Sequence, residues 1–183
     1  TMTMDGYTPV DWQDYCTRVA VSQNYRASVS GKSNKTSYYL ATGYSKQQGV
    51  INKTGVDKFD IRLNLDQEIN KMITLKSNTS FSTIATSMTS GTDKLIVRHM
   101  ISFKPIRGLE DDYSEYDENV TSPEAWFTDY DDDSSENLFN TNLSLDIKPL
   151  RWLTFRVKGG MVYRDKERSM WYGKMTSNGA QTN

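Results

Sequence analysis

The stretch KFDIRLNLDQEINKMITLKSNTSF, from Lys58 to Phe81, decides the fold class of this chain. Its first arm places an apolar side chain at every second position: Phe59, Ile61, Leu63 and Leu65. The positions between them carry polar groups: Asp60, Arg62, Asn64 and Asp66. Because successive side chains of a β-strand point to opposite faces, the pattern predicts a strand between two very different environments. Those environments are either a protein core and bulk water, or lipid and a water-filled lumen.

The composition favours lipid and a lumen. The 183 residues suggest one domain, and apolar residues make up only 36% of them, whereas aromatic residues reach 11%. That combination is unusual for a compact soluble domain, and it is typical of a barrel whose apolar band uses every other residue. The net charge of −1 gives no electrostatic case for binding nucleic acid or an anionic membrane surface.

Three further features limit the interpretation. No run of eighteen apolar residues occurs, so no transmembrane helix is expected, although strands cross a membrane without such a run. Cys16 is the only cysteine, which excludes an internal disulfide. The first residues, TMTMDGYTPVDWQ, lack the pattern of a signal peptide, and we expect residues 1–183 to be a piece of a longer protein.

Six stretches show the two-residue period of strands. They are residues 24–31, 37–46, the two arms of the opening stretch, 140–148 and 151–168. Within residues 37–46 the two faces cannot be told apart, because Tyr38, Leu40, Thr42 and Tyr44 alternate with Tyr39, Ala41 and Gly43. The sequence therefore predicts an all-β antiparallel meander.

The links between these strands alternate in length. Short, turn-like links are expected at residues 31–36, at Asn70-Lys71 and at Pro149-Leu150. Longer links are expected at residues 48–55 and at residues 87–137. In a meander, alternate links lie at the same end of the sheet, so one end has short turns and the other has long loops. Outer-membrane barrels show this asymmetry, whereas a soluble sandwich more often mixes link lengths.

The long link from 87 to 137 is expected to be an extracellular loop. Its apolar residues Leu95, Ile96 and Phe103, together with His99, are spaced like one face of a short helix that ends at Pro105. An acidic tract follows, and its aromatic residues are expected to pack and to be candidates for contact with a partner or substrate: Tyr113, Tyr116, Trp126, Phe127 and Tyr130.

No catalytic, cofactor or metal site is expected, and the chain is not expected to be an enzyme. His99 is the only histidine, and no nucleophile elbow, HExxH or CxxC motif occurs. The alternating Asp129, Asp131 and Asp133 begin like a calcium loop. Ser134 and Asn140 then stand where that loop needs Gly and Glu. A solvated acidic loop is the better interpretation.

The polar positions of the strands are the candidate functional residues, expected to face a lumen: Asp60, Arg62, Asn64, Asp66, Asp146, Arg156 and Lys158. In a soluble β-sandwich that binds carbohydrate, the same residues would form the solvent side, and the apolar residues would form a core. Alternation alone does not choose between the two.

The order of several motifs resembles the barrel region of SusC/RagA-like TonB-dependent outer-membrane transporters of the Bacteroidetes. The matching pieces are DWQD at 11–14, QNYRASVSG at 23–31, YYLATGYSKQQGVI at 38–51, FDIRLNLDQEIN at 59–70 and PLRWLTFRVKGGMVYRDKERSMWYG at 149–173. The resemblance covers nearly the whole chain and is weakest across residues 89–137.

This resemblance implies a plugged barrel of about 22 strands in the outer membrane, of which these residues supply the second to the seventh. It implies import of oligosaccharides or peptides, with energy from the TonB complex and with a SusD-like surface lipoprotein over the barrel. The plug and the TonB-binding segment are not among these residues, so the resemblance assigns neither role to a position here. The lipid bilayer is the remaining expected partner.

Overall fold

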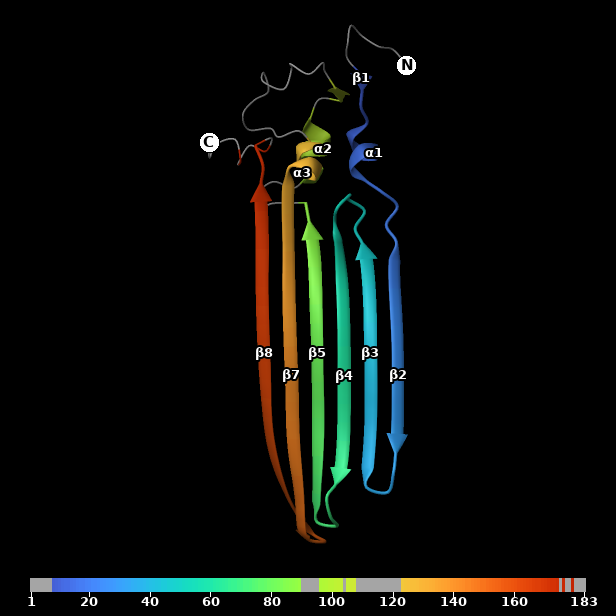
Figure 1. Cartoon of the computed structure of the whole chain (residues 1–183), viewed down its shortest axis with the longest axis vertical. Helices are drawn as coiled ribbons and strands as arrows, with labels where there is room; N and C mark the ends of the chain where they lie inside the picture. Colours follow the sequence, from blue (N-terminus) through green and yellow to red (C-terminus); the bar gives the residue numbers. More distant parts are fainter. Residues whose placement is uncertain are drawn as a thin grey trace.

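The computed structural model describes residues 8–89, 96–103, 105–107 and 123–174, together with Thr176 and Gly179. Six strands form one antiparallel sheet: β2 (Ser22–Lys32), β3 (Thr36–Gln48), β4 (Gly55–Glu68), β5 (Ile73–Met88), β7 (Tyr130–Leu150) and β8 (Leu153–Tyr172). Two short strands, β1 (Thr8–Pro9) and β6 (Ile106–Arg107), pair separately. The expected all-β meander is confirmed, because each strand of the large sheet pairs with the next along the chain (Figure 1).

The links alternate as expected. The three short turns lie at one end of the sheet, which we call the turn end, and the longer connections lie at the opposite end, the loop end (Figure 1). Two predicted boundaries were wrong, that of the last short turn and that of the long connection between β5 and β7. The last turn is Arg151-Trp152 rather than Pro149-Leu150, because the β7–β8 register shifts between Ile147 and Leu150 and lets β7 continue through the proline.

The long connection is also shorter than residues 87–137. β5 continues to Met88 and β7 begins at Tyr130, so the acidic run from Asp131 to Asp133 is strand rather than loop. Pairing explains the difference, because Asp132 and Asp133 lie opposite Met88 and Ser87 of β5, and Met170 and Ser169 of β8 face them from the other side. Backbone hydrogen bonds to two neighbours outweigh the poor strand propensity of aspartate.

The register assigns strand residues to two faces. Starting from Ile61, the cross-strand neighbours on its face are Thr42, Phe81, Phe139 and Tyr163. We call this side the apolar face, and its main residues are Tyr25, Val29, Tyr38, Leu40, Tyr44, Phe59, Ile61, Leu63, Leu65, Ile73, Leu75, Phe81, Phe139, Leu143, Leu145, Ile147, Phe155, Val157, Met161 and Tyr163. The undecided strand is thereby settled, because Tyr38, Leu40, Thr42 and Tyr44 lie on the apolar face.

The apolar face has no second layer among the described residues. Phe155 is 54% exposed and Val157 is 63% exposed, although both belong to the paired part of β8. The helices lie beyond the loop end rather than over the sheet (Figure 1). The soluble-sandwich alternative is therefore wrong for the described part of the chain, since a sandwich would cover these side chains.

The buried core lies instead at the loop end, where α1 (Trp12–Cys16), α2 (Ile96–Ser102) and α3 (Ala125–Thr128) meet the end of β7. Ile96, Trp126 and Tyr130 form its centre, and the rings of Trp126 and Tyr130 are 4.8 Å apart between centroids. We call these three residues the loop-end core. The expected short helix is confirmed as α2. No helix among the described residues is long and apolar enough to cross a membrane.

Hydrogen bonds join α1 to the β3–β4 connection. Asp11 caps α1 by accepting from the backbone N–H groups of Gln13 and Asp14, at 2.9 and 3.2 Å. Past the helix, the Arg18 guanidinium donates to the carbonyls of Gly49 and Thr54, at 3.1 and 2.8 Å. These bonds place the segment before β2 over the loop end of the sheet.

Candidate functional site on the polar face

The face opposite the apolar face carries most of the charged side chains of the sheet, and we call it the polar face. Its ten basic residues are Arg26, Lys32, Lys58, Arg62, Lys76, Arg156, Lys158, Arg164, Lys166 and Arg168. Its six acidic residues are Asp60, Asp66, Glu68, Asp132, Glu136 and Asp146. The polar face is therefore net positive, although the chain as a whole has a net charge of −1.

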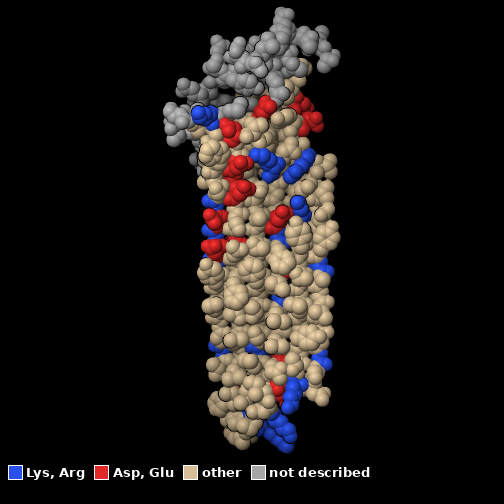
Figure 2. All heavy atoms as spheres, viewed as in Figure 1, with Lys and Arg blue, Asp and Glu red and all other residues tan. Residues whose placement is uncertain are grey.

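The few charges on the apolar side lie near the loop end. They are Lys46, Asp57, Asp131, Asp133, Asp165 and Glu167, five of them acidic. Figure 2 shows acidic side chains gathered in the upper part of the visible face, above a region that carries little charge. On β8 the uncharged run on this side extends from Phe155 to Tyr163. Nine residues span about 30 Å along a strand, or about 23 Å of height at a tilt of about 40°.

This uncharged belt moves along the strands across the sheet. On β2 the uncharged run extends from Gln23 to Gly31, but its large apolar side chains are only those of Tyr25 and Val29, and the register places Val29 level with Met161 of β8. On β8 the belt continues six residues further toward the turn end, to Phe155. A belt of constant depth produces such a shift when the strands are tilted against it, as they are in barrels.

Hydroxyl groups on the apolar face bond to one another. The Thr79 and Thr141 side-chain oxygens are opposite each other in the register and 2.9 Å apart. Each hydroxyl thus has a partner within the sheet, which lowers the cost of keeping it in an apolar environment. The face can therefore contact hydrocarbon without unsatisfied side chains at this level.

Three ion pairs join β7 and β8 on the polar face. Arg156 donates two hydrogen bonds to Asp146, at 2.6 and 2.9 Å. Nearer the loop end, Glu136 lies 2.9 Å from Arg164, and Asp132 accepts two bonds from Arg168, at 2.8 and 2.6 Å. Since both partners of each pair sit on the same face, the pairs support the register of the two longest strands.

The pair nearest the loop end is the most buried. Asp132 is 1% exposed, and it also accepts a hydrogen bond from the Tyr130 hydroxyl at 3.1 Å. Burial, and then the neighbouring Asp132 carboxylate, raise the pKa of Tyr130 well above its usual range. Tyr130 therefore stays a neutral donor, and the cluster fixes the junction between the loop-end core and the polar face.

The structure brings all seven predicted lumen residues onto the polar face. Asp60, Arg62, Asn64 and Asp66 follow one another on β4, while Asp146, Arg156 and Lys158 come from β7 and β8. Two shallow hollows open there. One, of about 500 Å³, is lined by residues that include Arg26, Tyr39, Asp60 and Arg62. The other, of about 540 Å³, lies nearer the turn end.

Sequence reasoning did not select the residues of the second hollow on β5 and β7. They are Lys76, Asn78, Asn142 and Ser144. The sequence shows that these residues alternate with apolar ones. It does not show which residues of neighbouring strands lie side by side, and this register decides which polar residues form a site. Extending the register of β4 into its partner arm would have found Lys76, which lies opposite Asp66.

The aromatic loop residues that were predicted to contact a partner or substrate do not form one exposed surface among the described residues. Trp126 and Tyr130 are 2% and 1% exposed, so these two rings pack in the loop-end core rather than present a free surface. Phe127 is partly buried against the same core. Tyr113 and Tyr116 lie outside the described residues, as does the side chain of His99. Contact of the loop with a substrate or partner stays a prediction.

Cys16 is fully buried at the end of α1. Burial raises the pKa of its thiol to about 11, so the thiol stays protonated at neutral pH. A buried, protonated thiol is a poor nucleophile and metal ligand. Among the described residues, no group of three or more His, Cys, Asp or Glu side chains is arranged to hold a metal ion.

Sequence comparisons find relatives among receptors of one kind, although no protein-family model matches the chain. TonB-dependent receptor P26 of Formosa agariphila is 28% identical over 118 residues, which are 64% of this chain and 12% of that receptor. TonB-dependent receptor P3 of the same organism is 31% identical over 68 residues, which are 37% of this chain and 7% of the receptor. The chain thus spans only a small part of these relatives.

Solved structures share the fold. The RagAB peptide importer in its closed-closed state matches with a TM-score of 0.68 and 23% identity, over 89% of this chain and 20% of that chain. The same importer in its open-open state matches with a TM-score of 0.69 and 19% identity, over 88% and 19% of the two chains. Both relatives and structural neighbours are named receptors or importers rather than enzymes.

A meander that has no second layer among the described residues, with an uncharged belt on one face and most of its charges on the other, is typical of the wall of a transmembrane β-barrel. The sequence relatives and the fold together support a SusC/RagA-like partial barrel, similar to the barrels of the TonB-dependent receptor class. This class belongs to the outer membrane, which is where the chain is located.

Proposed function

We propose that the chain forms part of the barrel wall of a TonB-dependent nutrient importer. In this proposal the apolar face contacts lipid and the polar face lines the lumen. The observation that supports it is the uncharged belt on one face of a sheet over which the described residues form no second layer. Lipid is the environment in which such a face is stable, because burial in it removes apolar surface from water.

The sheet edges support a larger barrel. In the described residues β2 pairs only with β3, and β8 pairs only with β7. A free strand edge leaves N–H and C=O groups without partners, which hydrocarbon does not tolerate. We therefore propose that further strands of the full-length protein pair with both edges, and that these six are the second to seventh of about 22.

The imported solute in this proposal is an oligosaccharide or a peptide, and the partners are a SusD-like surface lipoprotein and the TonB complex. Support comes from the structural neighbours, which are named as a peptide importer, and from the polarity of the face that would line the path. The loop end, with its long connection and ordered core, is the end that would face the outside and the lipoprotein.

Uptake by cells that lack the full-length protein tests this function. We expect loss of uptake of one class of labelled oligosaccharide or peptide, with recovery when the gene is restored. Uptake should also stop when a protonophore removes the energy that TonB transmits. Unchanged uptake of both solute classes, or recovery of the full-length protein in the soluble fraction, would contradict the proposal.

A further inference from the structure

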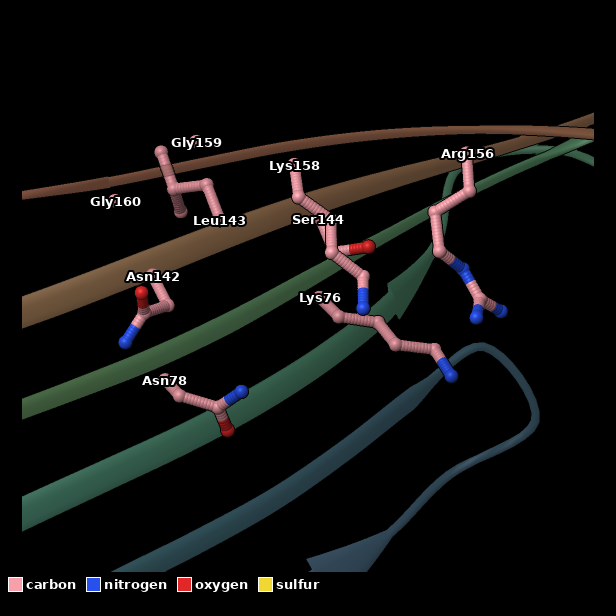
Figure 3. Close-up of a pocket in the computed structure, with 9 residues that line it drawn as sticks. All are labelled: Lys76, Asn78, Asn142, Leu143, Ser144, Arg156, Lys158, Gly159 and Gly160. Carbon is pink, nitrogen blue, oxygen red and sulfur yellow. The ribbon is translucent and has the colours of Figure 1, made fainter.

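The hollow near the turn end of the polar face is built from three strands, β5, β7 and β8 (Figure 3). Its polar lining forms two neighbouring register rows: Lys76, Ser144 and Lys158, and then Asn78, Asn142 and Gly160. In Figure 3 the lysine and asparagine side chains project to the same side of the sheet. The two lysines therefore flank a serine hydroxyl, with two amides alongside.

Glycine at position 160 shapes this hollow. A Cβ atom there would overlap the side-chain oxygen of Asn142, the residue opposite it in the register. The Asn142 amide also donates to Asn140 at 3.1 Å, which holds it along its own strand. Gly160 thus lets the amide lie close to β8 and leaves the space beside Lys158 open.

The two lysines are the cations of this hollow that form no direct ion pair with a carboxylate among the described residues, although the charge of Lys76 does act on Asp146. Arg156 also lines the hollow, but its guanidinium is matched by the two hydrogen bonds to Asp146. Neither Lys76 nor Lys158 forms an ion pair with any residue that the structure describes. This holds although Asp66 lies opposite Lys76 in the register. Two unmatched ammonium groups repel one another unless an anion lies between them.

The remaining polar groups are mainly donors. Ammonium groups donate only, and serine hydroxyls and amide N–H groups can donate as well. A donor-rich hollow with excess positive charge suits a ligand that carries several acceptor oxygens and a negative charge. Carboxylate, sulfate and phosphate groups share that chemistry, whereas a neutral sugar hydroxyl uses it only in part.

We propose that Lys76 and Lys158, with Ser144 between them, form a subsite for an oxyanion group of the imported solute. The inference rests on the proposed function, because the subsite serves transport only if the polar face lines the lumen. It goes further by naming an anionic solute class, either an acidic peptide or an oligosaccharide with carboxylate or sulfate groups. The net positive charge of the whole polar face would draw such a solute inward.

Lysine modification in the full-length protein tests the subsite. Reductive methylation is followed by mass spectrometry in sodium chloride, sodium sulfate and sodium acetate at equal ionic strength. We expect sulfate, acetate or both to slow methylation of Lys76 and Lys158 at least about threefold, with no change at Lys58 on the same face. Protection by sulfate alone indicates sulfated saccharides, and protection by acetate indicates carboxylates.

Three results would overturn the proposal. Chloride could protect as well as the other two anions, which would indicate ionic screening alone. Lys58 could be protected equally, which would indicate the general charge of the face. Both lysines could stay unreactive in every salt, which would mean that another part of the protein already occupies the hollow.

Transport measurements separate this inference from the proposed function. In the variants Lys76→Gln and Lys158→Gln, uptake of anionic solutes should fall about fivefold, while Lys46→Gln, on the apolar side near the loop end, changes it little. If the wild-type protein imports only neutral solutes, the proposal of an oxyanion subsite is wrong, whereas the proposed function as an importer is supported. If no solute is imported, the proposed function itself fails.

Discussion

Neighbouring residues on β4 test which side of the sheet contacts lipid. Leu63 lies within the uncharged belt, and Asn64, the next residue, lies on the polar face. In the full-length barrel, we expect Leu63→Arg to lower the free energy of unfolding by about 2–4 kcal/mol, because the arginine would enter hydrocarbon. Urea unfolding in lipid vesicles measures this value. Asn64→Arg is the matched control, and an equal loss in both variants would argue against the assignment of faces.

A second residue-scale prediction concerns Cys16. With its pKa raised by burial to about 11, the thiol should react with iodoacetamide far more slowly at pH 8 than a free thiol does. The free energy of unfolding should also fall as pH rises from about 9 to about 11, because the unfolded chain forms the thiolate first. Alkylation at the rate of free cysteine in the folded protein would contradict the burial of Cys16.

At the scale of elements, the loop-end core should be a local unit. Trp126 of α3 is 2% exposed and packs against Ile96 and Tyr130. We expect Trp126→Ala to cost about 3–5 kcal/mol in the free energy of local opening, since it leaves a large cavity. Hydrogen exchange in α2 and α3 measures this cost. Ile101→Ala, at a position 69% exposed, should change exchange little, and comparable effects in both variants would refute this core.

The start of β7 provides another matched pair. Asp132 is buried against Arg168, whereas the Asp131 side chain is 62% exposed and, among the described residues, forms an ion pair with Lys53 alone. We expect Asp132→Asn to speed hydrogen exchange in residues 130–134 and 168–172, because the arginine loses its carboxylate partner. Asp131→Asn should leave exchange nearly unchanged. The opposite ranking would show that the buried pair does not fix the junction.

The sequence could predict the strands because alternation is a local property. Phe59 to Asp66 shows both faces within one strand, and the residues between strands indicate all three short turns, although the last of them lies two residues later than predicted. It could not predict that residues 131–133 are strand, since their pairing with the ends of β5 and β8 is a long-range effect. The hollow at Lys76 and Lys158 was equally hidden, because three strands must be placed level before those residues meet.

At the scale of the whole molecule, charge is separated between the two faces of the sheet and also along the length of the strands. The polar face is net positive, while the acids on the apolar side gather near the loop end. Below these acids the apolar side is uncharged, and its large apolar side chains extend further toward the turn end on β8 than on β2. A tilted wall with lipid on one side and water on the other accounts for all three features.

The most direct test of this account places single cysteines at positions 59–66 of the full-length protein, in a Cys16→Ser background. Each variant is labelled with a small fluorophore and reconstituted in vesicles. We predict that brominated phospholipids quench the label at Phe59, Ile61, Leu63 and Leu65, and that aqueous iodide quenches it at Asp60, Arg62, Asn64 and Asp66. Quenching by iodide at both sets, or no quenching by lipid at the apolar set, would contradict the account.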